Sequence, residues 1–159
     1  MLRLKKINRE NVWNILKLEV SDDQKSFVAT NGISIIEAYT AITENGYAFP
    51  FAIYEDDIPV GFLMIGYDVD DYWYDAPKIA KGNYNLWRLM IDKNYQGKGL
   101  GKEAIRLALD FINTFPCGIG EYCWLSYEAE NDIARQLYSS FGFVETGEKD
   151  GEDLIAVLK

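Results

Sequence analysis

Residues 85–112 constrain the fold of this chain more than any other segment. An apolar run at residues 86–91 has the length of a strand, and residues 100–112 carry apolar side chains at helical spacing. Between them lies Gln-Gly-Lys-Gly-Leu-Gly, residues 96–101. Its alternate glycines let backbone N–H groups approach a ligand closely, and the start of a helix favours an anion. The segment therefore predicts a seat for a phosphorylated cofactor.

Two common phosphate-binding motifs fit this segment poorly. The P-loop requires Gly-Lys-Ser/Thr, whereas Gly101 and Lys102 are followed by Glu103. The dinucleotide pattern G-x-G-x-x-G/A matches as far as Ala104, but its glycines should follow the strand directly. Here residues 92–96 intervene, and too little chain remains for a series of βαβ units. Neither motif explains the segment.

A third pattern fits better. The spacing Gln-x-x-Gly-x-Gly at residues 96–101 resembles the acetyl-CoA signature of the GCN5-related N-acetyltransferase (GNAT) superfamily. A second block of that superfamily, Asn-Asp-Ile-Ala-Arg-Gln-Leu-Tyr-Ser-Ser-Phe-Gly-Phe, follows at residues 131–143 with one strand between the two. The resemblance implies acetyl-CoA as co-substrate, one GNAT-like domain over residues 1–159, and direct attack of an amine on the thioester.

The resemblance also implies site residues. The strand end would bind the pantetheine arm through its backbone, the glycine segment would bind the pyrophosphate, and Asn131 would bind through its amide. The implied cofactor-binding residues are Leu89, Met90, Ile91, Gln96, Gly97, Lys98, Gly99, Leu100, Gly101, Lys102 and Asn131. Tyr138 would act as general acid toward the leaving sulfur, since its ordinary pKa of about 10 keeps it protonated. The structural alternatives are a helix cap for Asn131 and a core position for Tyr138.

The general base stays open at this stage. Many family members place a glutamate on the strand that corresponds to residues 86–91, but this chain has none there. Glu128 and Glu130, just past a strand expected at residues 122–127, could act through water, and so could backbone carbonyl groups.

Composition excludes several other classes of protein. The chain has no histidine, which removes Ser–His and Cys–His nucleophiles and most zinc sites, so no metal is expected. Cys117 and Cys123 lack metal or redox spacing, and reduced thiols suit the cytoplasm. A net charge of -9 disfavours nucleic acid, and no apolar run is long enough for a membrane span. The charged start is not followed by an apolar core, so no signal peptide is expected. Three lysines, Lys93, Lys98 and Lys102, would offset repulsion of the cofactor phosphates.

The periodicity predicts a mixed α/β (α+β) fold with a twisted sheet of about seven strands and about four helices. Strands are expected at residues 2–7, 48–54, 58–65, 86–91, 122–127, 144–148 and 154–158, and helices start near Asn8 or Asn11, at Ser34, at residue 100 and at Asn131. Strands 86–91 and 122–127 should be parallel because a helix connects them, and the resemblance implies that they splay apart.

The second expected helix has a predicted buried face. Ser34 would cap it, Gly46 would end it, and the apolar face would comprise Ile35, Ile36, Tyr39 and Ile42.

For the acceptor, the chain resembles bacterial spermine/spermidine acetyltransferases within the superfamily. Residues 86–92, 95–102 and 20–28 carry this likeness, which implies a small cationic amine and substrate contacts at Gln24, Phe27 and Glu128. A loop at residues 67–83 interleaves acids with aromatics, and both groups bind ammonium. The same loop could instead be a solvated surface or the edge of a homodimer. A protein N-terminus or lysine as acceptor, or a non-catalytic acyl-CoA-binding module, remain the competing hypotheses.

Overall fold

The computed structural model describes all residues from Met1 to Lys159. One seven-stranded mixed sheet runs through it in the order β1-β2-β3-β4-β5-β7-β6. The strands are β1 (Leu2–Lys6), β2 (Tyr47–Glu55), β3 (Ile58–Tyr67), β4 (Tyr84–Ile91), β5 (Cys123–Tyr127), β6 (Val144–Asp150) and β7 (Asp153–Leu158). The helices are α1 (Val12–Lys17), α2 (Asn31–Thr43), α3 (Leu100–Ile112) and α4 (Asp132–Ser140). The predicted mixed sheet, four helices and parallel β4–β5 pair are confirmed.

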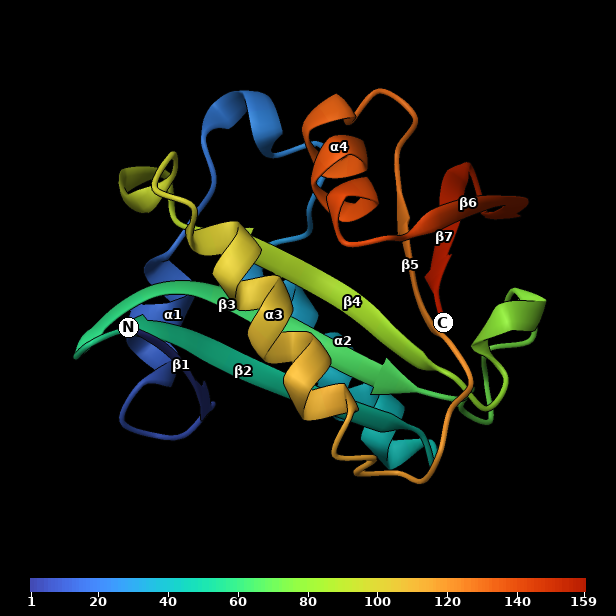
Figure 1. Cartoon of the computed structure of the whole chain (residues 1–159). Helices are drawn as coiled ribbons and strands as arrows, with labels where there is room; N and C mark the ends of the chain where they lie inside the picture. Colours follow the sequence, from blue (N-terminus) through green and yellow to red (C-terminus); the bar gives the residue numbers. More distant parts are fainter.

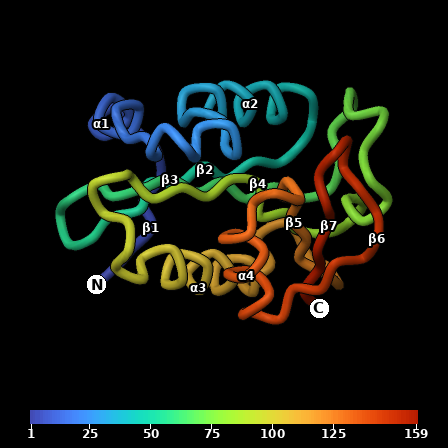
Figure 2. The backbone as a smooth tube through the Cα atoms, turned by 90° about the horizontal axis from the view of Figure 1, so that it is seen from above, coloured from blue at the N-terminus to red at the C-terminus, as the bar shows by residue number.

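The sheet separates two layers of helices. Figure 2 shows α1 and α2 on one face and α3 and α4 on the other. Strand β3 is buried on both faces, so its side chains alternate between two cores: Leu63 and Ile65 pack with α3, whereas Phe62 and Met64 pack with α1 and α2. This explains why the sequence there is continuously apolar rather than alternating.

The sheet opens between β4 and β5. Their parallel ladder is limited to Tyr84 opposite Cys123 and Asn85 opposite Trp124, after which the strands diverge (Figure 1). A β-bulge interrupts β4 at the same place, because Leu86 pairs with Ile65 while Arg88 pairs with Met64 and leaves Trp87 without a partner. The predicted splay is therefore present, and it leaves one edge of β4 free of strand partners beyond Asn85.

The predicted N-cap of α2 at Ser34 is wrong. The N-cap is Thr30, four residues earlier, whose hydroxyl oxygen accepts a hydrogen bond from the Ile33 amide at 3.2 Å, and the helix begins at Asn31. Ser34 lies inside the first turn and donates its hydroxyl to the Thr30 carbonyl. The left-handed residue at the end of the helix is Asn45, with φ of 64°, one residue before Gly46.

The predicted buried face of α2 is also wrong in part. Ile36, Tyr39 and Ile42 are 64%, 73% and 55% exposed, whereas Ala38 and Ala41 face the sheet. The small side chains let the helix approach the sheet closely, so the larger apolar residues stand on the outer side. A prediction of the buried face of α2 from hydrophobicity alone therefore fails for these three residues.

Two smaller features complete the frame. The turn between β6 and β7 is formed by Gly151 and Glu152, and Asp150 stands opposite Asp153 across it. No helix of the chain has the length and apolar character needed to cross a membrane.

Candidate active site

A cleft of about 890 Å³ lies where β4 and β5 separate. Its walls include all of the predicted cofactor- and substrate-binding residues except Lys98 and Lys102. Lys93 and the possible base Glu130 do not border it either. The predicted residues in its lining are Gln24, Phe27, Leu89, Met90, Ile91, Gln96, Gly97, Gly99, Leu100, Gly101, Glu128, Asn131 and Tyr138. The fold thus brings segments 24–27, 89–101 and 128–138 around one space.

The glycine segment has the geometry of an anion seat. Gly97 and Gly99 adopt left-handed backbone conformations, with φ of 80° and 78°, and Gly99 is the N-cap of α3. A Cβ at either position would meet no atom within 4 Å, so the space in front of them is open. Gly101 differs, because its backbone is helical and an added Cβ would lie an ordinary 3.8 Å from Leu137. The fold does not need glycine there, which agrees with the predicted close approach of a ligand.

The free edge of β4 provides the second part of the seat. Backbone groups of Leu89 to Ile91 on the side facing β5 have no strand partner. An extended ligand arm can pair with such an edge as an added strand would. Together with the unsatisfied amides at the start of α3, this edge fits a ligand with a phosphate end and an extended amide-containing arm.

Asn131 and Tyr138 stand at either end of one face of α4. The Asn131 side-chain oxygen accepts from the Ala134 amide at 3.2 Å, so its capping role is observed. The Tyr138 ring stacks on Tyr127 at 6.2 Å with an 8° tilt and packs edge-on against Phe143. Burial raises the pKa of Tyr138 above its ordinary value, so the hydroxyl stays protonated at neutral pH. The Tyr138 hydroxyl donates to no group of the chain, whereas the Tyr127 hydroxyl donates to Glu145 at 2.8 Å.

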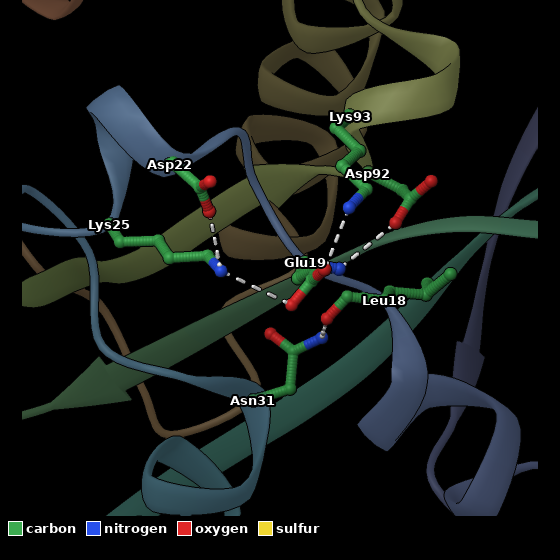
Figure 3. A network of polar contacts seen from close by, with 7 residues as sticks. All are labelled: Leu18, Glu19, Asp22, Lys25, Asn31, Asp92 and Lys93. Carbon is green, nitrogen blue, oxygen red and sulfur yellow. Dashed lines mark hydrogen bonds and ion pairs between the residues drawn. The ribbon is translucent and has the colours of Figure 1, made fainter.

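The segment between α1 and α2 forms one wall of the cleft and is anchored beside the glycine segment (Figure 3). The buried Asp92 carboxylate accepts from the Glu19 amide at 2.9 Å. The Glu19 carboxylate is bound by Lys93 at 2.8 Å and Lys25 at 3.5 Å, and the pKa of Glu19 is lowered chiefly by its hydrogen bond from Lys93. A second tether joins Gln96 to the Gln24 side-chain oxygen at 2.8 Å.

This network changes the expected role of Lys93. Its ammonium group is committed to Glu19, so it is not a free cation for phosphate. Lys98 and Lys102 make no ion pair within the chain, although the Lys98 ammonium lies 5.4 Å from the Tyr95 ring centre. Gln96 also donates to the Ile91 carbonyl at 2.9 Å, so it holds the glycine segment against the end of β4.

A second hollow, of about 530 Å³, adjoins the cleft. It is lined by five carboxylates, one guanidinium and several aromatic rings. The charged residues are Glu37, Asp68, Asp70, Asp150, Asp153 and Arg88, and the aromatic ones are Tyr47, Tyr67, Tyr72, Trp73, Trp87 and Trp124. We call this space the acidic hollow.

Four residues border both spaces: Trp87 and Arg88 on β4, Ser126 on β5, and Asp153 at the start of β7. We call this set the junction. Arg88 is half-buried there, and its guanidinium binds Glu37 on α2 at 2.7 Å. The sequence predicted the loop acids Asp68 and Asp70, but it gave no signal for Glu37, Asp150 or Asp153, which are brought in by distant elements.

Comparison with known proteins decides the family. The family model described as "Acetyltransferase (GNAT) family" matches residues 9–143. The chain belongs to the GNAT acetyltransferase family. As a GNAT enzyme it is an N-acetyltransferase with acetyl-CoA as co-substrate, which is the ligand that the glycine segment and the β4 edge fit.

Two Bacillus subtilis proteins are similar to this GNAT enzyme over most of its length. A "Probable spermine N(1)-acetyltransferase" from subspecies natto is 32% identical over 94% of this chain and 91% of its own. The "Spermine/spermidine N(1)-acetyltransferase" of strain 168 is 31% identical over the same shares. The fold resembles aminoglycoside acetyltransferase AAC(6')-Ib in complex with coenzyme A, with a TM-score of 0.77, 14% identity, and coverage of 100% of this chain and 95% of that one.

The cysteines of this GNAT enzyme are not suited to a covalent mechanism. Both are free, and Cys123 is buried, which raises its pKa to about 12. Burial also raises the pKa of Cys117. Neither borders the cleft, so no thiol is available to form an acyl-enzyme there.

Proposed function

We propose that this enzyme transfers the acetyl group to a primary amine of a small polycation, with spermine or spermidine as the acceptor. The observation that carries the proposal is the acidic hollow, which adjoins the acetyl-CoA cleft and shares the four junction residues with it. The names of the two Bacillus relatives support it, since both refer to spermine.

The charges of the acidic hollow suit several ammonium groups. Glu37 is neutralised by Arg88 and Asp68 by Lys81 at 3.6 Å, but Asp70, Asp150 and Asp153 make no ion pair. Aromatic faces, which also attract ammonium, surround these carboxylates. A protein lysine or N-terminus would be better served by an uncharged groove, so the acidity of the hollow favours the polyamine.

The proposed reaction is a direct attack. The amine would enter from the acidic hollow, pass the junction and attack the thioester carbonyl held along β4. Tyr138 would give its proton to the departing sulfur, a role that agrees with its protonated hydroxyl, which is free of partners in the chain. Its stacking on Tyr127 would hold the hydroxyl in place while the bond breaks.

The test is acetylation of a panel of amines with acetyl-CoA at several ionic strengths. We expect spermine and spermidine to exceed a neutral aryl amine in kcat/KM, and their KM to rise with salt as the charges are screened. If kcat/KM for spermidine does not exceed that for the aryl amine, and KM for spermidine does not change with salt, the polyamine assignment is wrong. The acetyltransferase activity is not affected by that result.

A further inference from the structure

The acceptor amine needs a group that takes its proton. A primary aliphatic amine is an ammonium ion at neutral pH, and only its neutral form attacks a thioester. A general base must lie within hydrogen-bond reach of that nitrogen, directly or through one water. The group should therefore stand where the acidic hollow meets the acetyl-CoA cleft.

Asp153 is the one carboxylate at the junction. Other carboxylates border a single space or neither: Glu128 lines only the cleft, Asp150 lines only the hollow, and the exposed Glu130 lines neither. The sheet order explains the position. Strand β7 pairs with β5 so that Leu154 stands opposite Tyr127, which places Asp153 just beyond the end of the splayed strand.

The Asp153 carboxylate is also unoccupied by partners. It makes no hydrogen bond or ion pair, because the nearby Arg88 binds Glu37 at 2.7 Å and the Trp87 carbonyl at 3.2 Å. Burial raises the pKa of Asp153, and the charge of Arg88 opposes this shift in part. A carboxylate of raised pKa is a stronger base than an ordinary aspartate.

The charged neighbours come from several elements. Asp150 on β6 stands opposite Asp153, and its own pKa is raised by burial and by the charges of Asp153 and Asp75. Arg88 on β4 with its partner Glu37 on α2 faces the junction, and Glu128 lies in the adjoining cleft. The carboxylates outnumber Arg88, so they stabilise both an arriving ammonium ion and a proton held on Asp153.

We propose that the Asp153 carboxylate is the general base of acetyl transfer, removing a proton from the acceptor ammonium at the junction. The neutral nitrogen then attacks the thioester carbonyl carbon, the C–N bond forms and the C–S bond breaks. The nitrogen loses two protons in the whole reaction. Asp153 takes the first and passes it to solvent. The second equals in number the proton that the departing sulfur gains, so one proton in total is released. This inference rests on the proposed function only in that the acceptor is a cationic amine.

The decisive experiment is the pH dependence of kcat for Asp153→Asn. The assay uses spermidine, or, if the wild type does not acetylate spermidine, whichever primary aliphatic amine of the panel it acetylates. We expect kcat to fall about 10²-fold at pH 7, the lower end of the usual contribution of a general base. The deficit should shrink as the pH nears the pKa of the amine, because the free amine needs no base. Glu152→Gln, an exposed neighbour outside both spaces, is the matched control and should behave as wild type.

Two further measurements keep the result interpretable. Unchanged acetyl-CoA affinity of Asp153→Asn shows that the variant is folded. Asp150→Asn should raise KM for the amine more than it lowers kcat, because Asp150 borders only the acidic hollow. A deficit of Asp153→Asn that is absent or equal at every pH, or a pH-dependent deficit found in Glu128→Gln instead, overturns the assignment. If spermidine is not a substrate, the proposal of a polyamine acceptor is wrong. The proposal that Asp153 is the general base is then tested with the amine that the enzyme does acetylate.

Discussion

The cleft proposed to hold acetyl-CoA and the acidic hollow are built in different ways. The cleft is lined chiefly by three segments, residues 20–29, 86–101 and 126–138, and its middle segment offers backbone amides, a free strand edge and glycines. The hollow takes side chains from α2, the loop at residues 67–83, β4, β5 and the β6–β7 hairpin. A backbone site depends on local conformation, whereas a side-chain site depends on which elements the sheet places together. The first is therefore readable from a short motif and the second is not.

The largest expected effect concerns the backbone site. Gly101→Asp should abolish acetyl-CoA binding, because a side chain and a negative charge enter the phosphate seat. The fold accepts a Cβ at this position, so the loss reports on the ligand. Titration calorimetry measures it, and Arg106→Asp on the exposed face of α3 should bind normally. Normal acetyl-CoA affinity in a folded Gly101→Asp variant would show that the glycine segment does not bind the phosphates.

The substitution Tyr138→Phe should have the second-largest effect. The substitution keeps the stack on Tyr127 but removes the proton donor, so we expect kcat to fall by about 10²–10⁴-fold with little change in acetyl-CoA affinity. Because burial raises the pKa of Tyr138, the wild-type rate should not decline as the pH passes the ordinary tyrosine value of about 10. Steady-state kinetics over pH 7–10.5 measure both effects, and a loss below about threefold would leave Tyr138 a packing residue.

Asp70→Asn tests the side-chain site with a smaller expected effect. Each carboxylate contributes modestly in a solvated hollow, so KM for spermidine should rise about two- to fivefold, and less at high salt. Asp71→Asn is the matched control: Asp71 carries the same charge one residue away, but it binds Asn45 at 2.7 Å outside the hollow. Equal changes in the two variants would mean that general charge, rather than the hollow, attracts the amine.

Lys93→Met should have the least effect on acetyl-CoA. Its ammonium group serves Glu19, so KM for acetyl-CoA should change less than about twofold, as expected for an exposed ion pair. Lys98→Met provides the comparison, because Lys98 makes no ion pair and lies within the glycine segment. If Lys93→Met weakens acetyl-CoA binding more than Lys98→Met does, the interpretation of the network in Figure 3 is wrong.

The sequence predicted the fold well where local signals agreed. The bounds of α3, the cap of α4 at Asn131 and the order of helices and strands along the chain all followed from periodicity and capping residues. It failed at α2, because the buried face is made of Ala38 and Ala41 while larger apolar residues are exposed, which hydrophobic spacing cannot reveal. The ion pair that occupies Lys93 joins residues 74 positions apart, and no pattern along the chain indicates it.

The acceptor side escaped prediction for a topological reason. Strand β7 lies between β5 and β6, so the last hairpin of the chain returns to the point where β4 and β5 separate. Asp150 and Asp153 flank the turn of that hairpin, and only this return of the chain brings their side chains to the acidic hollow. The loop at residues 67–83 was recognised because its acids and aromatics are adjacent, but only some of them, such as Asp70 and Trp73, face the hollow.

The gap between β4 and β5 has a mechanical consequence. Two residue pairs form the whole ladder between the four-stranded and three-stranded parts of the sheet. The rest of their attachment is mainly packing, on α3, where Ile105 shares a core with Leu86 and Leu125, and around Trp124 and Ile155, which share a second core with Ala80. A joint held mainly by packing would resist separation and would still allow a small rotation. A pantetheine arm lying along β4 would act as a wedge in this joint. Loading and release of the co-substrate would then alter the spacing between Arg88 on one part and Asp153 on the other, so the same hinge that receives acetyl-CoA would adjust the passage for the amine.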